Sequence, residues 1–283
     1  MLIKDAIQLG GKVLAASNIP NSAREARLLL QFVTKLSDDK ILFNYEQTLN
    51  SKQKGSFEQL LARRAKSEPL AKIIGKKFFW DDEFITSQDT LDPRPDSETI
   101  IESCIKYFSD SNQSYRILDL GVGTGCLLLS LLKIYSNSIG IGNDISAKAL
   151  KIAKQNIINL KLEQKVLLTR QNWLDGINGY FDIIIANPPY IKTEDIEQLD
   201  DAVKKFDPLV ALDGGKDGLD CYRYLSKSIK KHLSPNGMAF IEFGQNQEND
   251  LIEIFTNEDY QVKDIVKDLN NIYRIIIVSC ANV

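Results

Sequence analysis

The chain has 283 residues, more than one domain of roughly 100–200 residues usually needs, so we expect two domains. Hydrophobic residues make up 43% of it and charged residues 26%, which is typical of soluble globular proteins and excludes a disordered or low-complexity chain. No run approaches the roughly 18 uninterrupted apolar residues of a membrane span, and the N-terminus lacks the apolar stretch of a signal peptide. We therefore expect a cytoplasmic protein with no membrane partner.

The formal net charge of −3 is distributed unevenly. The first 80 residues hold 14 Lys and Arg against 7 Asp and Glu, a charge of +7, which leaves −10 for the other 203 residues. The opposite net charges of the two parts favour two modules, and the basic module can bind an acidic surface of a partner. A solvated helical surface would explain the excess of basic residues equally well. The negative total argues against a general nucleic-acid binder, whose domain is usually basic.

The cysteines and the histidine exclude several kinds of site. The four cysteines lie far apart without C-x-x-C spacing, so we expect buried thiols and neither a zinc site nor a redox dithiol. His232 is the only histidine. This excludes most histidine-based hydrolase triads and histidine-rich metal sites, and no metal is expected.

The N-terminal part of the chain is expected to form helices. Ile3, Ile7 and Leu14 keep helical spacing. Ser22 and Glu25 have the spacing of a reciprocal capping box. The helix that they would begin carries its apolar residues at intervals of four, at Leu28, Phe32 and Leu36. Asn50 or Ser51 can cap a further helix that ends before Pro69.

Two short features separate these helices from the rest. Aromatic and β-branched residues from Ile73 to Thr86 predict a β-hairpin. The run Pro93-Arg94-Pro95-Asp96-Ser97-Glu98 is a stiff connector, in which Asp96 or Ser97 can cap the next helix. We therefore expect three parts: a helical domain over 1–72, a hairpin with connector over 73–96, and a larger domain over 97–283.

The larger domain alternates apolar strands with helices, which predicts a doubly wound, mostly parallel α/β sheet. Strands are expected near 116–120, 139–144, 165–169, 182–186 and 237–242, and helices over 126–134 and 147–158. The last two strands, 261–266 and 273–279, are joined by a short turn. Such a link requires an antiparallel pair, so the seven-stranded sheet should have an antiparallel last strand.

A glycine-rich turn follows the first strand of this sheet. It consists of Gly121, Val122, Gly123, Thr124 and Gly125. Glycines let the backbone approach a ligand, and the carboxyl ends of parallel strands are where such sheets bind nucleotides. Asp144 ends the next strand about 20 residues downstream, where a carboxylate can accept both ribose hydroxyls. The pattern predicts an adenosine-containing ligand, although dehydrogenases also use glycine-rich turns and a plain tight turn is a further alternative.

The tetrapeptide Asn187-Pro188-Pro189-Tyr190 directly follows the strand near 182–186. Two prolines fix the backbone there without leaving a proline N–H unpaired. The Asn187 side-chain oxygen and the Pro188 carbonyl can therefore accept both hydrogens of a planar NH₂ group. The alternative, a turn that merely ends a strand, does not explain why a glycine-rich turn occurs in the same sheet.

Together, the turn, Asp144 and the tetrapeptide resemble those of class I S-adenosylmethionine-dependent methyltransferases that act on amino groups conjugated to a planar system. More narrowly, the chain resembles bacterial peptide chain release factor glutamine N5-methyltransferases over almost its whole length. Besides these motifs, the narrower resemblance rests on Glu68–Gly75, Pro93–Glu98, Phe206–Pro208 and Ala211–Leu219. Asn172 stands where this family often has aspartate, and Val122 where threonine is frequent.

The resemblance implies a role for each site residue. The turn Gly121 to Gly125 would bind the methionine part of S-adenosyl-L-methionine, with S-adenosyl-L-homocysteine as product. Asp144 would hold the ribose, and Trp173, which could otherwise be an ordinary core aromatic, would lie against the adenine. Asn187 would contact cofactor and substrate, and Asn187 and Pro188 would be catalytic. The substrate pocket would be formed by Asn187, Pro188, Pro189 and Tyr190.

The implied reaction is methyl transfer to the glutamine of the glycine-glycine-glutamine loop of release factors, in support of translation termination. An amide nitrogen is a poor nucleophile unless it is oriented, which the two acceptors would do. The alternatives are the same chemistry on a ribosomal-protein glutamine or on an exocyclic amine of a nucleic-acid base, and a noncatalytic cofactor-binding scaffold. No direct nucleic-acid contact is expected, because the larger domain is acidic, and a monomer is our default.

Overall fold

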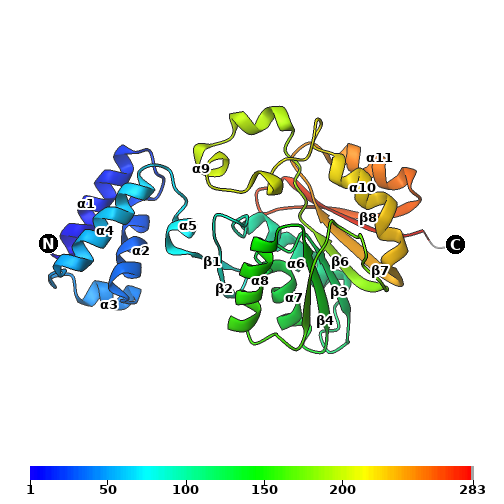
Figure 1. Cartoon of the computed structure of the whole chain (residues 1–283), viewed down its shortest axis with the longest axis horizontal. Coiled ribbons are helices and arrows are strands. Elements are labelled where there is room, and N and C mark those ends of the chain that lie inside the picture. The colour runs from blue at the N-terminus through cyan, green and yellow to red at the C-terminus, as the bar shows by residue number, and fades with distance from the viewer. Residues whose placement is uncertain (282–283) are drawn as a thin grey trace. The chain divides into compact units, whose positions relative to one another are not determined.

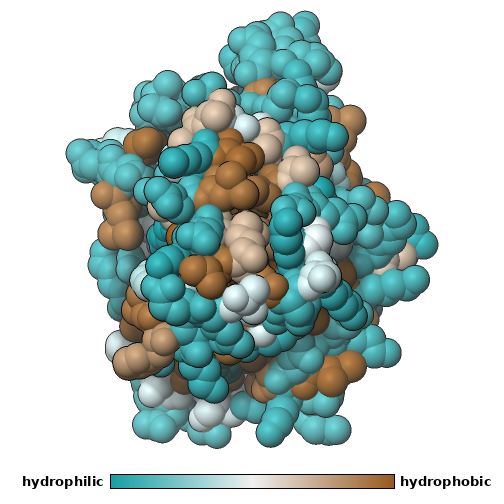
Figure 2. Space-filling view, turned by 90° about the vertical axis from the view of Figure 1, so that its left-hand side faces the viewer, coloured by the Kyte–Doolittle hydropathy of each residue, from teal (hydrophilic) through white to brown (hydrophobic). Residues whose placement is uncertain are grey.

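The computed structural model of the chain describes residues 1–281. Two compact units are present in Figure 1: residues 1–75 with 200–206, and residues 76–199 with the chain from Asp207 onward. On the face of the molecule drawn in Figure 2, hydrophilic residues predominate over scattered hydrophobic ones. Each helix within the described part of the chain is too short or too polar to cross a membrane.

The first unit consists of helices around one apolar core. They are α1 Ile3–Ala16, α2 Ser22–Thr34, α3 Asp38–Phe43, α4 Ser51–Arg64, α5 Leu70–Ile74 and α9 Asp201–Lys204. Close packing of α1 against its neighbours requires a glycine at position 10. A Cβ on Gly10 would lie 2.8 Å from Ala26 Cβ and 3.0 Å from Phe57 Cζ. The core of this unit therefore has no room for a larger residue there.

The predicted capping box at the start of α2 is wrong. Asn21 is the N-cap, Ser22 is already helical, and no side chain caps this helix end. Glu25 instead binds the buried Arg64, whose Nε lies 2.5 Å and Nη2 3.2 Å from the two carboxylate oxygens. An ion pair with a buried arginine holds the carboxylate more firmly than a solvated cap, because the arginine has no water to bind.

The apolar face of α2 also differs from the predicted stripe. Its buried residues are Ala26, Leu29 and Leu30, while Leu28 and Phe32 are only half-buried. The helix ends at Thr34, before Leu36, because Lys35 adopts a left-handed conformation with φ of 60°. In contrast, the predicted cap of α4 is confirmed.

Asn50 and Gln53 form a reciprocal capping box at the start of α4. Asn50 Oδ1 accepts from Gln53 N at 2.8 Å, and Gln53 Oε1 accepts from Asn50 N at 3.1 Å. Asn50 is exposed and Gln53 half-buried, and no buried charge competes for them.

The second unit begins with the predicted hairpin and contains the predicted sheet. The hairpin strands are β1 Lys76–Phe79 and β2 Asp82–Ile85. The sheet strands are β3 Arg116–Leu120, β4 Ile139–Asp144, β5 Val166–Arg170, β6 Phe181–Ala186, β7 Leu233–Glu242, β8 Tyr260–Lys267 and β9 Tyr273–Cys280. Their order is β5-β4-β3-β6-β7-β9-β8, parallel except that β9 is antiparallel to both neighbours. The doubly wound sheet with an antiparallel last strand is thus confirmed.

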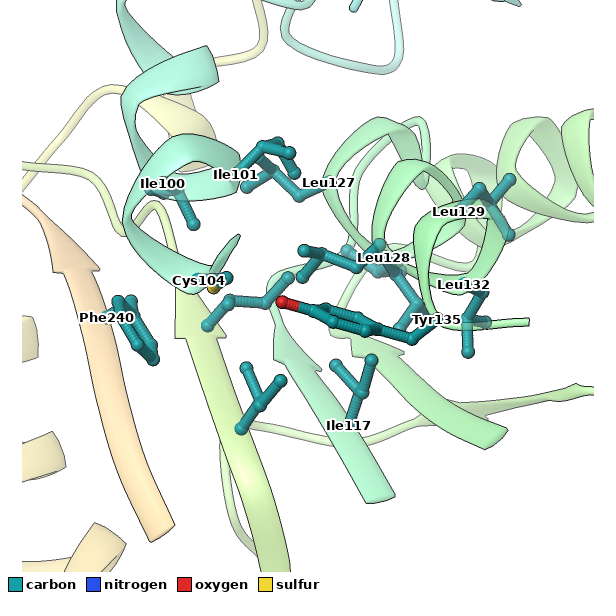
Figure 3. Packing of buried hydrophobic residues seen from close by; sticks show 14 of the residues in the cluster. Ile100, Ile101, Cys104, Ile117, Leu127, Leu128, Leu129, Leu132, Tyr135 and Phe240 are labelled. Atoms are coloured by element: carbon teal, nitrogen blue, oxygen red, sulfur yellow. The ribbon is translucent and has the colours of Figure 1, made fainter. Parts of the chain in front are cut away.

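Helices cover both faces of this sheet because its strands are apolar on both sides. They are α6 Glu98–Tyr107, α7 Cys126–Ile134 and α8 Ala147–Asn159 on one face, and α10 Asp220–Ile229 and α11 Glu248–Asn257 on the other (Figure 1). In β6, Ile183 and Ile185 pack under the first group, and Ile184 and Ala186 under the second. Figure 3 shows side chains of α6 and α7 meeting Ile117 and its neighbours above the first face.

The thiols are only partly as expected. Cys104 on α6 is fully buried, but the other three, Cys126, Cys221 and Cys280, are half-buried, and none of the four forms a disulfide. Two of the half-buried thiols, Cys126 and Cys221, line the cavity described next. A cavity wall covers a side chain less than the core does, which explains the partial exposure of these two thiols.

Candidate active site

Three adjacent parallel strands end at one edge of the sheet and carry the predicted site residues. Strand β3 lies between β4 and β6. Gly121 follows β3, Asp144 is the last residue of β4, and Asn187 follows β6. The chain runs outward from β3 in both directions, so this edge is the topological switch point at which α/β sheets bind ligands.

Backbone hydrogen bonds hold the glycine-rich turn against β4. The amides of Gly121 and Val122 both donate to the Asn143 carbonyl, at 3.0 and 2.8 Å. Gly121 has φ of 79°, a conformation that favours glycine. Asp144 reaches back to the same turn, since its two carboxylate oxygens accept from Gly123 N at 3.0 Å and Ser146 N at 2.8 Å. Burial raises the pKa of Asp144, and these amides oppose that shift.

One cavity of about 290 Å³ lies at this edge, lined entirely by residues of the second unit. Eight of the eleven residues singled out in the sequence line it: Gly121, Val122, Gly123, Thr124, Asp144, Trp173, Asn187 and Pro189. Thus the turn after β3, the acid of β4 and the start of the tetrapeptide after β6 meet in one space.

The other three, Gly125, Pro188 and Tyr190, are not among the lining residues. Gly125 is the N-cap of α7, where a Cβ would lie 3.2 Å from Leu129 Cδ1. The Tyr190 ring packs against the core under α10 and α11, and its carbonyl accepts from Gln247 Nε2 at 3.1 Å. Burial raises the pKa of Tyr190 to about 12. In this structure, Gly125 and Tyr190 support the walls of the cavity.

Trp173 lies against the glycine-rich turn. Its Cζ3 is 3.6 Å from the position that a Cβ on Gly121 would take. Asn143 Nδ2 donates to the Trp173 carbonyl, which ties this segment to β4. Trp173 has φ of 49°, so its backbone is held in the left-handed region where bulky residues are rare. The ring is thereby a fixed wall of the cavity, and Asn172 lines it too.

Two buried acceptors in the cavity wall were missed in the sequence. Asp119 on β3 and Asn143 on β4 are 1% and 0% exposed. Asp119 Oδ2 and Asn143 Oδ1 have no hydrogen-bond partner among the described residues. Burial raises the pKa of Asp119 to about 8. Buried acceptors without partners are costly, so these two atoms suit a ligand that donates hydrogen bonds or carries positive charge.

A signal for both acceptors was present in the sequence. Asp119 interrupts the apolar run Ile117-Leu118-Asp119-Leu120, and Asn143 stands in the neighbouring strand β4, where it is fully buried. A polar residue inside a strand that is buried on both faces needs a reason, and the adjacent glycine-rich turn supplies one.

The connector 93–98 also contributes to the site. Arg94 and Ser97 line the cavity. Arg94 Nη2 lies 2.7 Å from Asp207 Oδ2, which joins the connector to the segment after α9. The prediction that Asp96 or Ser97 caps α6 is confirmed in position only: Ser97 is the N-cap, but its side chain makes no capping bond. Instead, Ser97 Oγ donates to Glu242 Oε2 at 2.5 Å and accepts from Asn187 Nδ2 at 3.0 Å.

Comparison with known proteins identifies the class. A family model described as PrmC N-terminal domain matches residues 5–75, and one described as methyltransferase small domain matches residues 87–206. The solved catalytic domain of hMettl16 in complex with a MAT2A 3′UTR hairpin shares the fold, with a TM-score of 0.55 and 14% identity, over 70% of this chain and 76% of that chain. The sheet order, the glycine-rich turn and the methyltransferase match together define a class I methyltransferase.

Two curated relatives make the family specific. The release factor glutamine methyltransferase of Rhodospirillum rubrum is 39% identical over 260 residues, which cover 91% of this chain and 78% of the relative. That of Agrobacterium fabrum is 36% identical over 268 residues, or 94% of this chain and 93% of the relative. The chain belongs to the release factor glutamine methyltransferase family. The resemblance found in the sequence is thereby confirmed, and the protein is a methyltransferase.

Proposed function

We propose that this protein transfers a methyl group from S-adenosyl-L-methionine to the side-chain nitrogen N5 of the glutamine in the glycine-glycine-glutamine loop of peptide chain release factors. Membership of the release factor glutamine methyltransferase family supports the assignment of this substrate. The observation that carries the chemistry is that Asn187 opens onto the same cavity as the glycine-rich turn and Asp144. An amide acceptor for the substrate and a binding site for an adenosine cofactor therefore share one cavity, as methyl transfer requires.

The residues in the cavity fit S-adenosyl-L-methionine, which supplies a methyl group bound to positively charged sulfur. The backbone from Gly121 to Thr124 would bind its methionine part, with Gly125 shaping the turn. Asp144 has a second lone pair on each oxygen for the ribose hydroxyls. Trp173 would lie against the adenine. Asp119 and Asn143, whose buried acceptors lack partners among the described residues, would receive the ammonium hydrogens, and the Asp119 carboxylate would balance the positive charge.

The chain's own residues prepare the substrate amide for attack. Asn187 Oδ1 and the Pro188 carbonyl would each accept one N–H of the glutamine side chain, which orients the nitrogen. Both acceptors also stabilise the positive charge that develops on that nitrogen during transfer. The proton leaves to water after methylation, so no side-chain base is needed. Pro189 forms part of the cavity wall, and Pro188 and Tyr190 hold the tetrapeptide in place.

The helical domain 1–72 would dock the release factor through its basic surface. Its charges are not all available, because Arg63 and Arg64 bind Glu68 and Glu25. Exposed basic residues offer a cleaner test: Lys12, Arg24 and Lys52. Reversing these three charges should weaken release-factor binding, with cofactor binding unchanged. The protein would act as a monomer in the cytoplasm without contacting nucleic acid.

The experiment that tests the proposal offers labelled S-adenosyl-L-methionine with three substrates in parallel: purified release factor, ribosomal proteins and RNA. Label on the release factor alone is the expected result. Label on a ribosomal protein or on RNA alone would keep the chemistry and overturn the substrate. No label on any of them, with the cofactor bound, would favour a noncatalytic scaffold.

A further inference from the structure

Three polar side chains from distant parts of the chain form a buried relay next to the cavity. Glu242 is the last residue of β7, Ser97 lies in the connector, and Asn187 follows β6. Ser97 and Glu242 are each 2% exposed. The bonds run in one direction, from Asn187 Nδ2 to Ser97 Oγ at 3.0 Å and from Ser97 Oγ to Glu242 Oε2 at 2.5 Å.

The direction of this relay follows from which atoms can donate. An ionised carboxylate can only accept, so Glu242 takes the single hydroxyl hydrogen of Ser97. The Ser97 oxygen then has only lone pairs to offer Asn187, and the side-chain atom of Asn187 that can use them is Nδ2. Oδ1, on the other branch of the amide, is thereby turned away from Ser97.

The orientation matters because the two branches of an asparagine side chain have nearly the same shape and opposite hydrogen-bonding character. Its last torsion is broad and roughly two-fold, so the side chain alone does not choose between them. Turned by 180°, Asn187 would present an NH₂ group to the substrate NH₂, and two donors would face each other. A glutamine nitrogen would then be neither oriented nor stabilised.

We propose that Glu242, acting through Ser97, fixes the side-chain amide of Asn187 so that Oδ1 faces the substrate. The inference rests on the proposed function, in which Asn187 Oδ1 accepts the substrate N–H. Ser97 and Glu242 are positioning residues in this account, because they act on the substrate through Asn187. The same bonds explain why Ser97 stands at the N-cap of α6 without capping it.

The charge on Glu242 depends on its surroundings. Burial raises the pKa of Glu242 to about 7, while hydrogen bonds from Ser97 and Asn187 and the nearby Arg274 favour its ionised form. The groups that face it are Arg274 on β9, Asp96 beside Ser97, Tyr190 after β6, Tyr222 on α10 and Cys126 on α7. Once protonated, Glu242 can donate to Ser97, whose own hydrogen is then free for Asn187 Oδ1. The relay should therefore reverse as the pH falls through about 7.

The first test removes the Ser97 hydroxyl. In methyl-transfer assays with release factor, Ser97→Ala should lower kcat about fivefold, the factor that one ordinary hydrogen bond supplies. KM for the release factor should change less, because the oriented acceptor is needed most in the transition state. Ser97→Thr, which keeps a hydroxyl, should restore kcat. The matched control is Ser130→Ala, since Ser130 on α7 is equally buried but its hydroxyl has no partner among the described residues.

The second test follows kcat against pH with both substrates saturating. Wild-type kcat should be low near pH 6 and rise to a plateau above pH 8, because Glu242 ionises between these values. Glu242→Gln cannot ionise, so this step should disappear from its profile. The amide that this substitution introduces can still bond to Ser97, which separates the effect of charge from loss of the contact.

The outcomes separate the relay from the proposed function. Equal kcat for wild type, Ser97→Ala and Ser130→Ala would overturn the relay while leaving release-factor methylation intact. An unchanged pH step in Glu242→Gln would overturn it too, even if Ser97→Ala failed to fold. A wild-type protein that does not methylate release factor would instead overturn the proposed function.

Discussion

Cofactor affinity should depend steeply on pH through Asp119. This carboxyl group is buried in the cavity wall, has one oxygen without a partner among the described residues, and has a pKa raised to about 8 by burial. A cationic ligand favours the ionised carboxylate. Below pH 8, binding must therefore remove a proton from Asp119 first, whereas above pH 8 the carboxylate is already charged.

The size of the loss in cofactor affinity follows from the difference between the pH and the pKa of Asp119. A pH of 6 is about two units below the pKa of Asp119. Ionising this carboxyl group there costs about 3 kcal/mol, at roughly 1.4 kcal/mol per pH unit. The Kd for S-adenosyl-L-methionine should accordingly be about a hundredfold higher at pH 6 than at pH 9. Above pH 8 the Kd should no longer change with pH.

Titration calorimetry at a series of pH values measures this directly. Asp119→Asn keeps the shape of the side chain but cannot ionise, so its Kd should be weaker at pH 9 and nearly independent of pH. Any dependence that remains in the variant belongs to Asp144 or to the cofactor's own groups. A wild-type Kd that is the same at pH 6 and pH 9 would refute the reasoning, because Asp119 would then not sense the ligand.

Three further predictions concern single side chains. Asn187→Ala should remain folded and bind cofactor while kcat falls at least about a hundredfold, as when other transition-state contacts are removed; near-wild-type transfer would contradict the mechanism. Gly10→Ala should lower the unfolding free energy by about 1–2 kcal/mol, because its Cβ would lie 2.8 Å from Ala26 Cβ, whereas Gly55→Ala, with open space around it, should raise it slightly. Both are measured by denaturant unfolding. Glu242→Gln should gain stability relative to wild type as the pH rises from 5 to 8, by up to about 3 kcal/mol. The folded pKa of Glu242, about 7, exceeds the ordinary 4.5, so wild-type stability falls across this window and the variant's does not; a difference that is the same at both pH values would contradict this.

Much of the sheet could be predicted because its signals are local. All seven strands of the described sheet occur near the apolar runs that predict them, and only β7 begins markedly earlier, at Leu233 instead of near Gly237. The antiparallel direction of β9 followed from the short turn before it. Strand positions and the direction of a strand after a short turn depend on residues that are close together in the sequence. Such residues are therefore sufficient to predict them.

The missing capping bonds at α2 and α6 have the opposite cause, because each side chain has a partner far away in the chain. Glu25 does not cap α2 because Arg64, 39 residues later, binds it. Ser97 does not cap α6 because Glu242, 145 residues later, accepts its hydrogen. In both cases the local motif was compatible with a cap, but a buried charge formed the stronger contact. Sequence spacing could not show either partner.

The parts of the candidate site that the order of the strands brings together could be predicted from the sequence. The parts that depend on the direction of side chains could be predicted less well. The glycine-rich turn, Asp144 and Asn187 meet because strands β3, β4 and β6 are neighbours. That Tyr190 turns into the core under α10 and α11 depends on packing that the tetrapeptide alone does not encode. The directions of the four side chains of this tetrapeptide had to come from the structure.

The most direct test of the central claim compares a purified release factor with a variant whose glycine-glycine-glutamine loop has lost its glutamine. Both are incubated with the protein and labelled S-adenosyl-L-methionine, and the modified residue is located by tandem mass spectrometry. The account predicts one methyl group on that glutamine in the intact factor and none in the variant. Equal methylation of both factors, or methylation at another residue, would contradict it.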